Sequence, residues 1–494
     1  MDKIRNKPII RNLVLSFGLL VMAADALAVF TSGDNEEQRL QPRLQQAPIN
    51  PEFIRYLYER KVGEPWGGYT KDGHALGLIP SPLDPAIFKP EAGLEPPEQI
   101  ESLPAFYDLR TRNKLTPVKD QGCCGSCWAF AAFGSLESFL KPTASWDFSE
   151  QDLIEKHGFD YGVCDGGSTD MSAAYLARWA GPWRETLHPY EYSFLTAIPV
   201  VKHVQNIIML PDKRTALDNS KIKDAIYRYG AVLAGMHWDE SSYKSSTASY
   251  FYNGTDNSGG HVVCVVGWDD NYVKSKFKSR PAGNGAFIVK NSFGKRWGDF
   301  GYFYVSYYDR FFGKRGGSAV YKGESVNNYR ANYGYDDLGW VTNVGAGNSS
   351  TYWMANIFKA GATGYVKAVS FYTSANSNAY EIYIYTSISF GKPTTGTLYA
   401  KAKKGTILGQ GYYTTPLDFY VPITKGKYFS VVVKLRTTGY YYPIPIEYQW
   451  PGYSSAAKSR PGQSYISVNG KSWDELNSYG SSYTNVCLRA FTKY

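Results

Sequence analysis

A glycine-rich turn that leads into an apolar helix is the feature that most constrains this chain. The stretch from Gln121 to Phe130 reads QGCCGSCWAF, and apolar residues recur at helical spacing as far as Leu140 without a proline. This pattern predicts a buried helix over residues 125–140. Cys127 stands at the start of that helix, where free backbone N–H groups favour a negative sulfur and a pKa below the usual value of about 8.5. Cys127 is therefore a candidate nucleophile, and the alternative is a small buried cysteine that only packs.

Two further blocks carry the other residue types that a cysteine nucleophile needs. They read GHVVCVVGW from Gly260, with His261 in second place, and VKNSFGKRW from Val289, with Asn291 in third place. Together with Gln121, Cys124 and Trp128 around Cys127, these blocks resemble the papain family of cysteine peptidases. His261 follows Cys127 at the roughly 130–150 residues typical of such enzymes, and the inserted stretch 269–284 displaces the asparagine block.

The resemblance implies a catalytic role for each of these residues. Cys127 attacks the scissile carbonyl as a thiolate, and His261 holds the proton as imidazolium and then gives it to the leaving amine. Asn291 orients His261 through a hydrogen bond. The side-chain amide of Gln121 and the backbone N–H of Cys127 form the oxyanion hole.

The resemblance also implies the residues that bind substrate. Gly166 and Gly167 let an extended substrate backbone approach closely. The other expected substrate-binding residues are Trp297 in the asparagine block, and Thr169, Gly235 and Val262 around the pocket for the side chain two residues before the scissile bond. Small residues in this pocket predict a roomy apolar site that favours leucine, phenylalanine or tyrosine.

The six cysteines fit an exported protein, in which disulfides are permitted. By resemblance Cys124 pairs with Cys164, although the adjacent Cys123 competes for the same partner. Cys264 and Cys487 lie on apolar strands and are expected to be buried free thiols. Relatives often carry another paired cysteine where this chain has Lys156, so that second bridge is expected to be lost.

Two further residues depart from the family pattern. Phe293 replaces the tryptophan that usually shields the Asn–His hydrogen bond, so we expect reduced but not absent protection. Gly260 precedes His261 where a polar residue is common, which is expected to shift the pH optimum.

The first 28 residues have the layout of a secretory signal. A positive leader precedes an uncharged apolar stretch from Leu13 to Ala24, and Ala26-Leu27-Ala28 forms a small-x-small cleavage signal. Twelve apolar residues are too few to span a bilayer, which needs about 20. We expect removal of this signal after Ala28, with a retained anchor as the alternative, and no stable membrane insertion afterwards.

Residues 29–102 are polar and proline-rich, with one short helix expected over 51–61. Such a segment cannot build its own core, so it is draped over another domain, removed or loose. It lacks the long helical pattern of the family's inhibitory propeptides, which argues against latency by that mechanism. Cleavage just before Leu103 is expected, because Leu103-Pro-Ala-Phe-Tyr-Asp resembles the start of mature family enzymes.

Residues 103–325 are predicted to form an α+β papain-like peptidase with a helical lobe, a β lobe and a cleft between them. A second helix is expected to start at Ser149. Its hydroxyl caps the helix, while the Asp152 side chain reaches back to Ser149 in a capping-box spacing. Strands are expected at 231–234, 262–266, 286–290 and 302–307.

Residues 326–494 are predicted to form an all-β sandwich, because aromatic and β-branched runs at 367–373, 380–386 and 427–434 are separated by turns. This part resembles the lectin-like domain that follows papain-like peptidases in some bacterial and archaeal secreted proteins. The resemblance implies a possible cell-surface glycan as partner. Asp336 and Asp337 form an acidic pair that is expected to be solvated and not to bind a metal.

The formal net charge of +9 is not gathered in runs, so nucleic acid is not an expected partner. No phosphate loop, zinc-ligand spacing or nucleotide fingerprint is present, so no cofactor and no metal are expected. The leading hypothesis is a secreted or cell-surface cysteine endopeptidase acting on peptides or proteins, with the periplasm as another possible location. The alternatives are a transpeptidase that uses the same acyl-enzyme, and a catalytically weak papain-fold adhesin.

Overall fold

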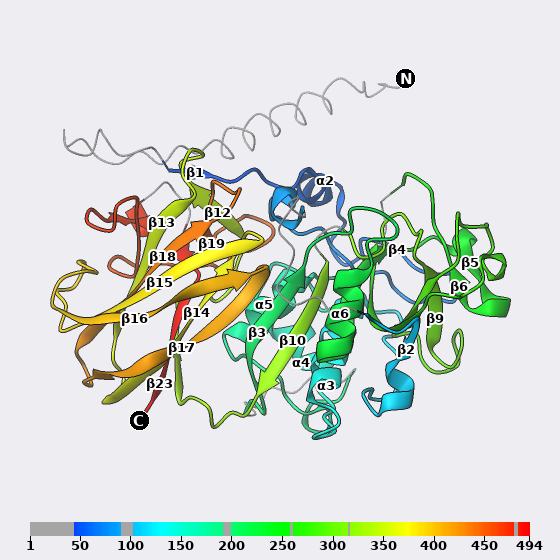
Figure 1. Cartoon of the computed structure of the whole chain (residues 1–494), viewed down its shortest axis with the longest axis horizontal. Helices are drawn as coiled ribbons and strands as arrows, with labels where there is room; N and C mark the ends of the chain where they lie inside the picture. Colours follow the sequence, from blue (N-terminus) through cyan, green and yellow to red (C-terminus); the bar gives the residue numbers. More distant parts are fainter. Residues whose placement is uncertain (1–43, 90–101, 191–198, 257–259, 315–316, 479–482) are drawn as a thin grey trace, which may run out of the picture.

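The computed structural model describes residues 44–89, 102–190, 199–256, 260–314, 317–478 and 483–494. The expected signal at residues 1–28 lies outside the described residues. A region of helices and strands lies beside a β-sandwich, and residues 44–89 run across the top of both (Figure 1). None of the helices in the described ranges is long and apolar enough to cross a membrane.

Among the described residues between 102 and 324, three α-helices pack together on one side, and a fourth, α6, packs against the sheet instead. α3 is almost wholly buried because its sequence, CWAFAAFGSLESFL, is apolar around most of its circumference. The Ser149 hydroxyl caps α4 by accepting the Asp152 N–H at 3.0 Å. The Asp152 side chain does not reach back as predicted, because it bonds the Tyr175 hydroxyl and Lys156 instead. The helices are α3 (Cys127–Leu140), α4 (Glu150–Lys156), α5 (Thr169–Ala177) and α6 (Ser220–Tyr229).

The other half of this region is a twisted, mainly antiparallel sheet with the predicted strands at its centre, where β4 pairs with β7 and β7 pairs with β8. The strands are β2 (Phe106–Asp108), β3 (His203–Leu210), β4 (Val232–His237), β5 (Tyr243–Lys244), β6 (Ser249–Tyr250), β7 (Gly260–Asp269), β8 (Ala286–Lys290), β9 (Tyr302–Ser306) and β10 (Ser318–Glu324).

The C-terminal region is all β, as predicted, and its strands form two facing sheets and a smaller third one. One sheet has the order β16-β15-β18-β13-β20-β21, and the small sheet has the order β1-β12-β19-β22. The strands are β11 (Ala331–Tyr333), β12 (Thr342–Gly345), β13 (Thr351–Lys359), β14 (Gly364–Thr373), β15 (Ser377–Thr386), β16 (Thr397–Leu408), β17 (Gln410–Ile423), β18 (Tyr428–Thr437), β19 (Ile444–Tyr448), β20 (Ser464–Ser467), β21 (Asp474–Glu475), β22 (Thr484–Val486) and β23 (Leu488–Lys493).

One sheet runs through both regions. β17 of the sandwich pairs with β3, from Gln410 opposite Met209 to Tyr413 opposite Asn206. β3 in turn pairs with β10, so β14, β17, β3, β10 and β4 belong to a single 13-stranded sheet. The two regions are therefore joined by backbone hydrogen bonds as well as by side-chain packing.

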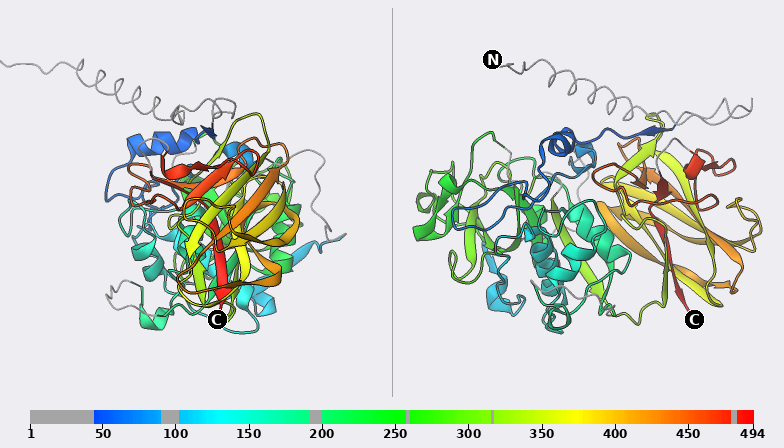
Figure 2. Two further views of the ribbon diagram at one scale, coloured as in Figure 1. Left: turned by 90° about the vertical axis from the view of Figure 1, so that its left-hand side faces the viewer. Right: turned by 180° about the vertical axis from the view of Figure 1, so that it is seen from behind.

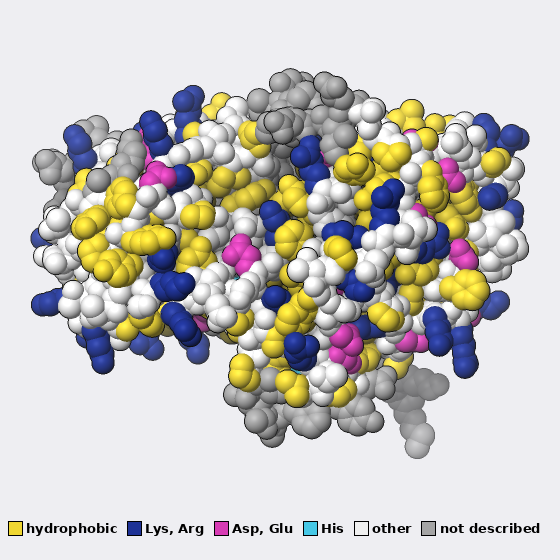
Figure 3. All heavy atoms as spheres, turned by 60° about the horizontal axis from the view of Figure 1, so that its bottom comes forward, with side chains coloured by type: hydrophobic (Ala, Val, Ile, Leu, Met, Phe, Trp, Pro, Cys, Tyr) yellow, Lys and Arg dark blue, Asp and Glu magenta, His cyan; other side chains and the backbone are white. Residues whose placement is uncertain are grey.

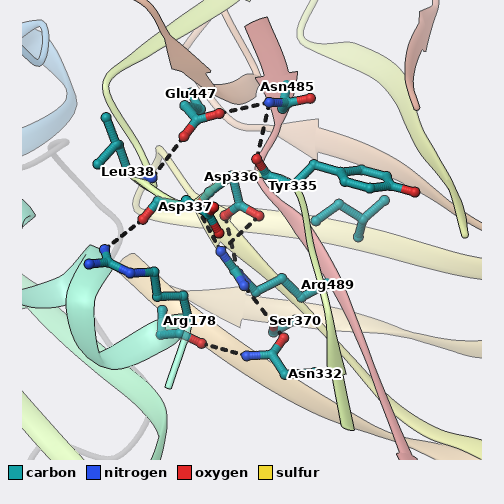
Figure 4. Close-up of polar contacts among 12 residues, drawn as sticks. Arg178, Asn332, Tyr335, Asp336, Asp337, Leu338, Ser370, Glu447, Asn485 and Arg489 are labelled. Carbon is teal, nitrogen blue, oxygen red and sulfur yellow. Dashed lines mark hydrogen bonds and ion pairs between the residues drawn. The ribbon is translucent and has the colours of Figure 1, made fainter. Parts of the chain in front are cut away.

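A buried charged network also joins the two regions (Figure 4). Arg489 and Asp336 form an ion pair at 3.2 Å, and both side chains are at least 97% buried. Arg178, the residue that follows α5 in the helical region, donates to the Asp337 carbonyl at 2.7 Å. The prediction that both acids are solvated was wrong for Asp336, because Arg489, more than 150 residues later in the chain, is buried against it. The prediction was right for Asp337, which is exposed.

Residues 44–89, here called the N-terminal segment, are draped over both regions (Figure 2). β1 (Gln45–Gln46) adds a strand next to β12, and α2 (Pro51–Glu59) matches the helix expected from the sequence. Phe53 of α2 is fully buried and packs edge-on against Tyr453 at 4.9 Å and Trp450 at 6.0 Å. The segment thus uses a core that the sandwich supplies.

Candidate active site

Cys127 lies at the first residue of α3, as the sequence predicts, and its side chain is fully buried. Backbone N–H groups of Val262 on β7 and of Gly77 in the N-terminal segment lie close enough to the thiol sulfur to lower its pKa against the larger effect of burial. Because Val262 directly follows His261, β7 brings the expected nucleophile and the expected base to one place. Cys127 therefore lies between the helical half, the sheet and a strand of covering chain.

His261 and Asn291 are brought together by the pairing of β7 with β8. The ring Nε2–H of His261 donates to Oδ1 of Asn291 at 2.8 Å, and this oxygen also accepts the Ser292 N–H at 2.9 Å. The other ring nitrogen, Nδ1, is buried and has no hydrogen-bond partner among the described residues. The imidazole is thus oriented by Asn291 and keeps one nitrogen available for proton transfer.

Phe293 covers this pair. Its ring stacks on His261 with centroids 4.7 Å apart, and Trp297 meets it edge-on at 5.4 Å. Trp238 packs edge-on against both Phe293 and His261. The smaller aromatic residue at position 293 is therefore supported by two tryptophans that exclude water from the His–Asn hydrogen bond.

The Gln121 side chain is fixed from both ends. Its Oε1 accepts the Ser292 hydroxyl at 2.6 Å, which directs the amide nitrogen toward the cleft. That nitrogen donates to the Cys124 carbonyl at 2.8 Å and to the Ala75 carbonyl at 2.9 Å. A peptide carbonyl from the N-terminal segment therefore already lies on the donor that is expected to bind the oxyanion.

Residues 74–81, here called the cleft segment, pass through the site in an extended conformation. Leu78 bridges two sides of the cleft, parallel to Gly167 and antiparallel to Gly260. Its N–H donates to the Gly260 carbonyl at 3.1 Å, and the Gly167 N–H donates to the Gly77 carbonyl at 2.8 Å. These are the bonds of a short strand added between two walls.

Three glycines allow this close approach. A Cβ on Gly77 would lie 1.9 Å from the Gly125 carbonyl oxygen, and one on Gly166 would lie 2.7 Å from the Gly77 carbonyl oxygen. Gly166 also has φ of +112°, a conformation that favours glycine. A Cβ on Gly167 would collide with the Trp128 ring at 2.2 Å. Backbone rather than side chains therefore forms this wall of the cleft.

A disulfide ties the loop that carries Gly166 and Gly167 to the turn that leads into α3. The structure bonds Cys124 to Cys164, and it leaves Cys123 exposed. Cys264 and Cys487 are free and buried, as the sequence predicts. The disulfide holds Gly166 and Gly167 opposite Cys127.

The residues expected to form the substrate pocket lie around Leu78 to different degrees. A Cβ on Gly235 would lie 3.1 Å from a Leu78 methyl group, and Thr169 lines the same cavity as Leu78. Val262 is buried beside the Cys127 sulfur instead. Trp297 stacks with Tyr243 at 4.9 Å on the far side of Phe293. Gly235 and Thr169 thus lie around Leu78, whereas Val262 and Trp297 belong to the surroundings of Cys127 and His261.

The protonation of the site differs from the sequence-based prediction of an ionised thiol. Burial raises the pKa of Cys127 to about 11, against the smaller opposing effect of the backbone N–H groups. Burial also lowers the pKa of His261 to about 4, although the bond to Asn291 acts in the other direction. At neutral pH the covered site therefore holds a neutral thiol and a neutral imidazole, because the cleft segment removes both from water.

Sequence reasoning did not anticipate that the cleft segment occupies the site. His74 stacks on Phe293 at 4.4 Å, and its Nε2 lies 3.3 Å from Asp120. The only signal was Gly77 in the stretch His74-Ala-Leu-Gly77-Leu78, since a glycine permits a close backbone approach but occurs widely in loops.

Comparisons with known proteins agree with this geometry. Residues 103–316 match the family model "Papain family cysteine protease", and residues 332–492 match "Lectin like domain". The viral cathepsin of Spodoptera litura multicapsid nucleopolyhedrovirus is 33% identical over 210 residues, which are 40% of this chain and 56% of that protein. Procathepsin L of Rattus norvegicus is 31% identical over 218 residues, covering 41% and 60%. The chain spans little more than half the length of these curated relatives.

Solved structures resemble both regions together. The cysteine protease and lectin-like domains of Cwp84, a surface layer associated protein of Clostridium difficile, align with a TM-score of 0.74 at 24% identity, over 91% of this chain and 98% of that one. The clostridial Cwp84 after propeptide cleavage aligns with a TM-score of 0.66 at 26% identity, over 78% and 99%.

The fold and site define a cysteine peptidase domain. The chain carries a papain-family cysteine peptidase domain followed by an all-β lectin-like domain. Its Cys, His, Asn and Gln motifs all fall within the matched peptidase residues.

Proposed function

We propose that this chain is the latent form of an exported cysteine endopeptidase that hydrolyses peptide bonds. Cys127 serves as nucleophile, His261 as acid and base, Asn291 as orienting residue, and Gln121 with the Cys127 N–H as oxyanion hole. The N-terminal segment leaves the cleft on activation, after cleavage before Leu103. The β-domain attaches the enzyme to a cell surface.

The observation that carries this proposal is the backbone pairing of Leu78 with Gly167 and Gly260 across the cleft. Pairing of this kind recognises the main chain of an extended peptide and not a particular side chain. A peptide or protein substrate is therefore the class of molecule that the cleft fits.

The cleft segment is held without being cut because its atoms do not align for attack. The carbonyl on the Gln121 amide belongs to Ala75, whereas the group on the Cys127 sulfur is the N–H of Gly77. Nucleophilic attack needs the sulfur and the oxyanion donor at the same carbonyl. The segment thus occupies the site as an unreactive peptide.

Departure of the segment would change the chemistry of Cys127 and His261. Water reaches both groups, which lessens the burial that raises the pKa of the thiol and lowers the pKa of the imidazole. A thiolate and imidazolium then support each other, the thiolate attacks the scissile carbonyl, and His261 protonates the leaving amine. Water, activated by the same imidazole, hydrolyses the acyl-enzyme.

The test compares the full chain with the same folded chain after it is cut before Leu103 and freed of the released segment. We expect cleavage of a peptide library only by the freed form, and a loss of at least about a thousandfold in Cys127→Ala. Equal activity of the freed wild type and Cys127→Ala would overturn the proposal. An added amine nucleophile that appears in the products would identify a transpeptidase, and absent labelling of the freed Cys127 by a peptidyl epoxide would identify an adhesin.

Exposed tyrosines and lysines support surface attachment through the β-domain. Tyr365 and Tyr420 are about half exposed on β14 and β17, and the Lys367 ammonium lies 3.5 Å from the Tyr420 ring centre. Figure 3 shows many Lys and Arg but few acidic side chains around the sandwich end of the molecule. Aromatic faces stack on sugars, and the cations suit acidic groups on a cell-surface glycan. Retention on anionic polysaccharide beads, weakened in Tyr420→Ala, is the expected result.

A further inference from the structure

A cavity behind the cleft segment contains a carboxyl group that the proposed mechanism does not use. The cavity lies at the start of α5 and is lined by Leu78, Ser81, Thr169, Asp170 and Gly260, among others. The Leu78 side chain lies against Gly260, where a Cβ would come within 2.8 Å of it. The glycine walls thus leave room for a side chain of the peptide in the cleft.

Asp170 is 94% buried at this cavity. The Ser81 hydroxyl of the cleft segment and the backbone N–H of Asp170 itself lie close enough to the carboxyl group to lower its pKa, against the larger effect of burial. Oδ2 has no hydrogen-bond partner among the described residues. None of the ion pairs in the described part of the chain involves Asp170. Burial raises the pKa of Asp170 to about 6, as expected for a carboxylate without a cation.

A buried carboxylate with an unused oxygen is costly, because its hydration is lost without compensation. Ser81 offsets part of this cost only while the cleft segment is in place. The second carboxyl group at this cavity, Glu52, belongs to the N-terminal segment and leaves with it. Once the segment leaves, the Asp170 carboxyl group faces the walls that the rest of the chain supplies, Ser168, Thr169, Gly260 and Gly317. A lysine or arginine side chain matches such a pocket, since its stem lies along the glycine walls and its charged end pairs with the carboxylate.

We propose that Asp170 is a specificity-determining residue that lets the Leu78 pocket accept lysine or arginine, in addition to leucine, two residues before the scissile bond. The proposal rests on the proposed peptidase function. The substrates it adds are basic peptides, in contrast to the purely apolar preference that the small pocket residues indicated.

The test uses the freed enzyme and three matched peptides that differ only at that position, which holds leucine, arginine or citrulline. Citrulline has the shape of arginine without its charge. We expect arginine to be cleaved within about tenfold of leucine in kcat/KM, and citrulline at least about tenfold more slowly than arginine. Equal rates for arginine and citrulline would overturn the proposal, whereas failure to cleave the leucine peptide would overturn the proposed function instead.

Variants at position 170 separate charge recognition from structure. Asp170→Asn is expected to lower the arginine-to-leucine ratio of kcat/KM by about tenfold or more, and Asp170→Glu is expected to retain part of it. Asp224→Asn removes the same charge from the exposed pair with Arg228 on α6 and is expected to leave the ratio unchanged. The ratio rises with pH in the wild type as the carboxyl ionises and stays flat in Asp170→Asn. An unchanged ratio in Asp170→Asn would contradict the role of this residue.

Discussion

Buried polar groups are paired differently in the cleft and at the joint between the two domains. In the cleft Nδ1 of His261, the Asn291 amide nitrogen and one oxygen of Asp170 have no hydrogen-bond partner among the described residues. At the joint Glu447 accepts from the Leu338 N–H at 2.7 Å and from Asn485 at 2.7 Å, and Arg489 is paired with Asp336 (Figure 4).

Asp336 Oδ1 at the joint also lacks a hydrogen bond among the described residues, but it is held by the ion pair with Arg489. We expect the groups of the joint to hold the architecture and the unpaired groups of the cleft to act on a ligand. A network whose members satisfy one another rigidifies the place where it lies. Unpaired buried groups are costly and are retained where a substrate or a reaction uses them. Four experiments test this comparison, and they are ordered by expected effect.

The largest effect is expected at the joint, from Arg489→Met. Removing one partner of a buried ion pair typically costs about 3–5 kcal/mol, because Asp336 would remain buried without its partner. Urea unfolding of the full chain measures this loss. Arg436→Met, at an exposed position on β18, is the control and should change stability by less than about 0.5 kcal/mol. Equal stability of the two variants would contradict the structural role of the network.

In the cleft, Gln121→Ala is expected to lower kcat of the freed enzyme by a factor of about 10²–10³, with stability nearly unchanged, since an oxyanion donor acts mainly in the transition state. Ser292→Ala keeps the Gln121 amide but removes the hydroxyl that holds its Oε1. A smaller loss in kcat, of about tenfold, is expected for this variant. Steady-state kinetics on one peptide measures both. A kcat of Gln121→Ala within threefold of wild type would argue against an oxyanion hole at this position.

The covered thiol gives a pH-dependent prediction. A pKa of about 11 for Cys127 means that, near pH 8, the full chain holds roughly a hundredfold less thiolate at this residue than an ordinary thiol would. Iodoacetamide should therefore label Cys127 slowly until the pH approaches 11. The freed enzyme should be labelled at pH 7. Mass spectrometry in a Cys123→Ser background removes the signal of the exposed thiol, and rapid labelling of the full chain at pH 7 would contradict burial as the cause.

The smallest effect is expected from Phe53→Leu in α2. The change keeps an apolar side chain but loses the edge-on contacts with Trp450 and Tyr453, at a cost of about 1 kcal/mol. The uncovered fraction of the full chain, and with it the residual peptidase activity, should rise about fivefold. Val62→Ala is the control because Val62 is 87% exposed. The same activity in both variants would mean that α2 does not hold the cleft segment.

The sequence was sufficient to predict those parts of the site that depend on residues close together in the chain. The helix that begins at Cys127 and the strands around His261 and Asn291 follow from local apolar patterns, and the motifs supply the residue types. The pairing of β3 with β17 was not predicted, because His203–Leu210 finds its partner 200 residues later. The same holds for Leu78 in the cleft and for Asp336 beside Arg489. Local patterns do not encode partners that only the folded chain brings together.

The sheet that passes from β17 into β3 fixes how the cleft is presented. Four residue pairs of this ladder join the domains, so the sandwich cannot swing on a hinge without first breaking main-chain bonds. An enzyme held to a polymer layer through its sandwich would therefore keep its catalytic groove at one height and one angle above that layer. Whether a peptide bond of a neighbouring protein lies at that height would then decide whether it is cut, in addition to the preference of the groove for particular side chains.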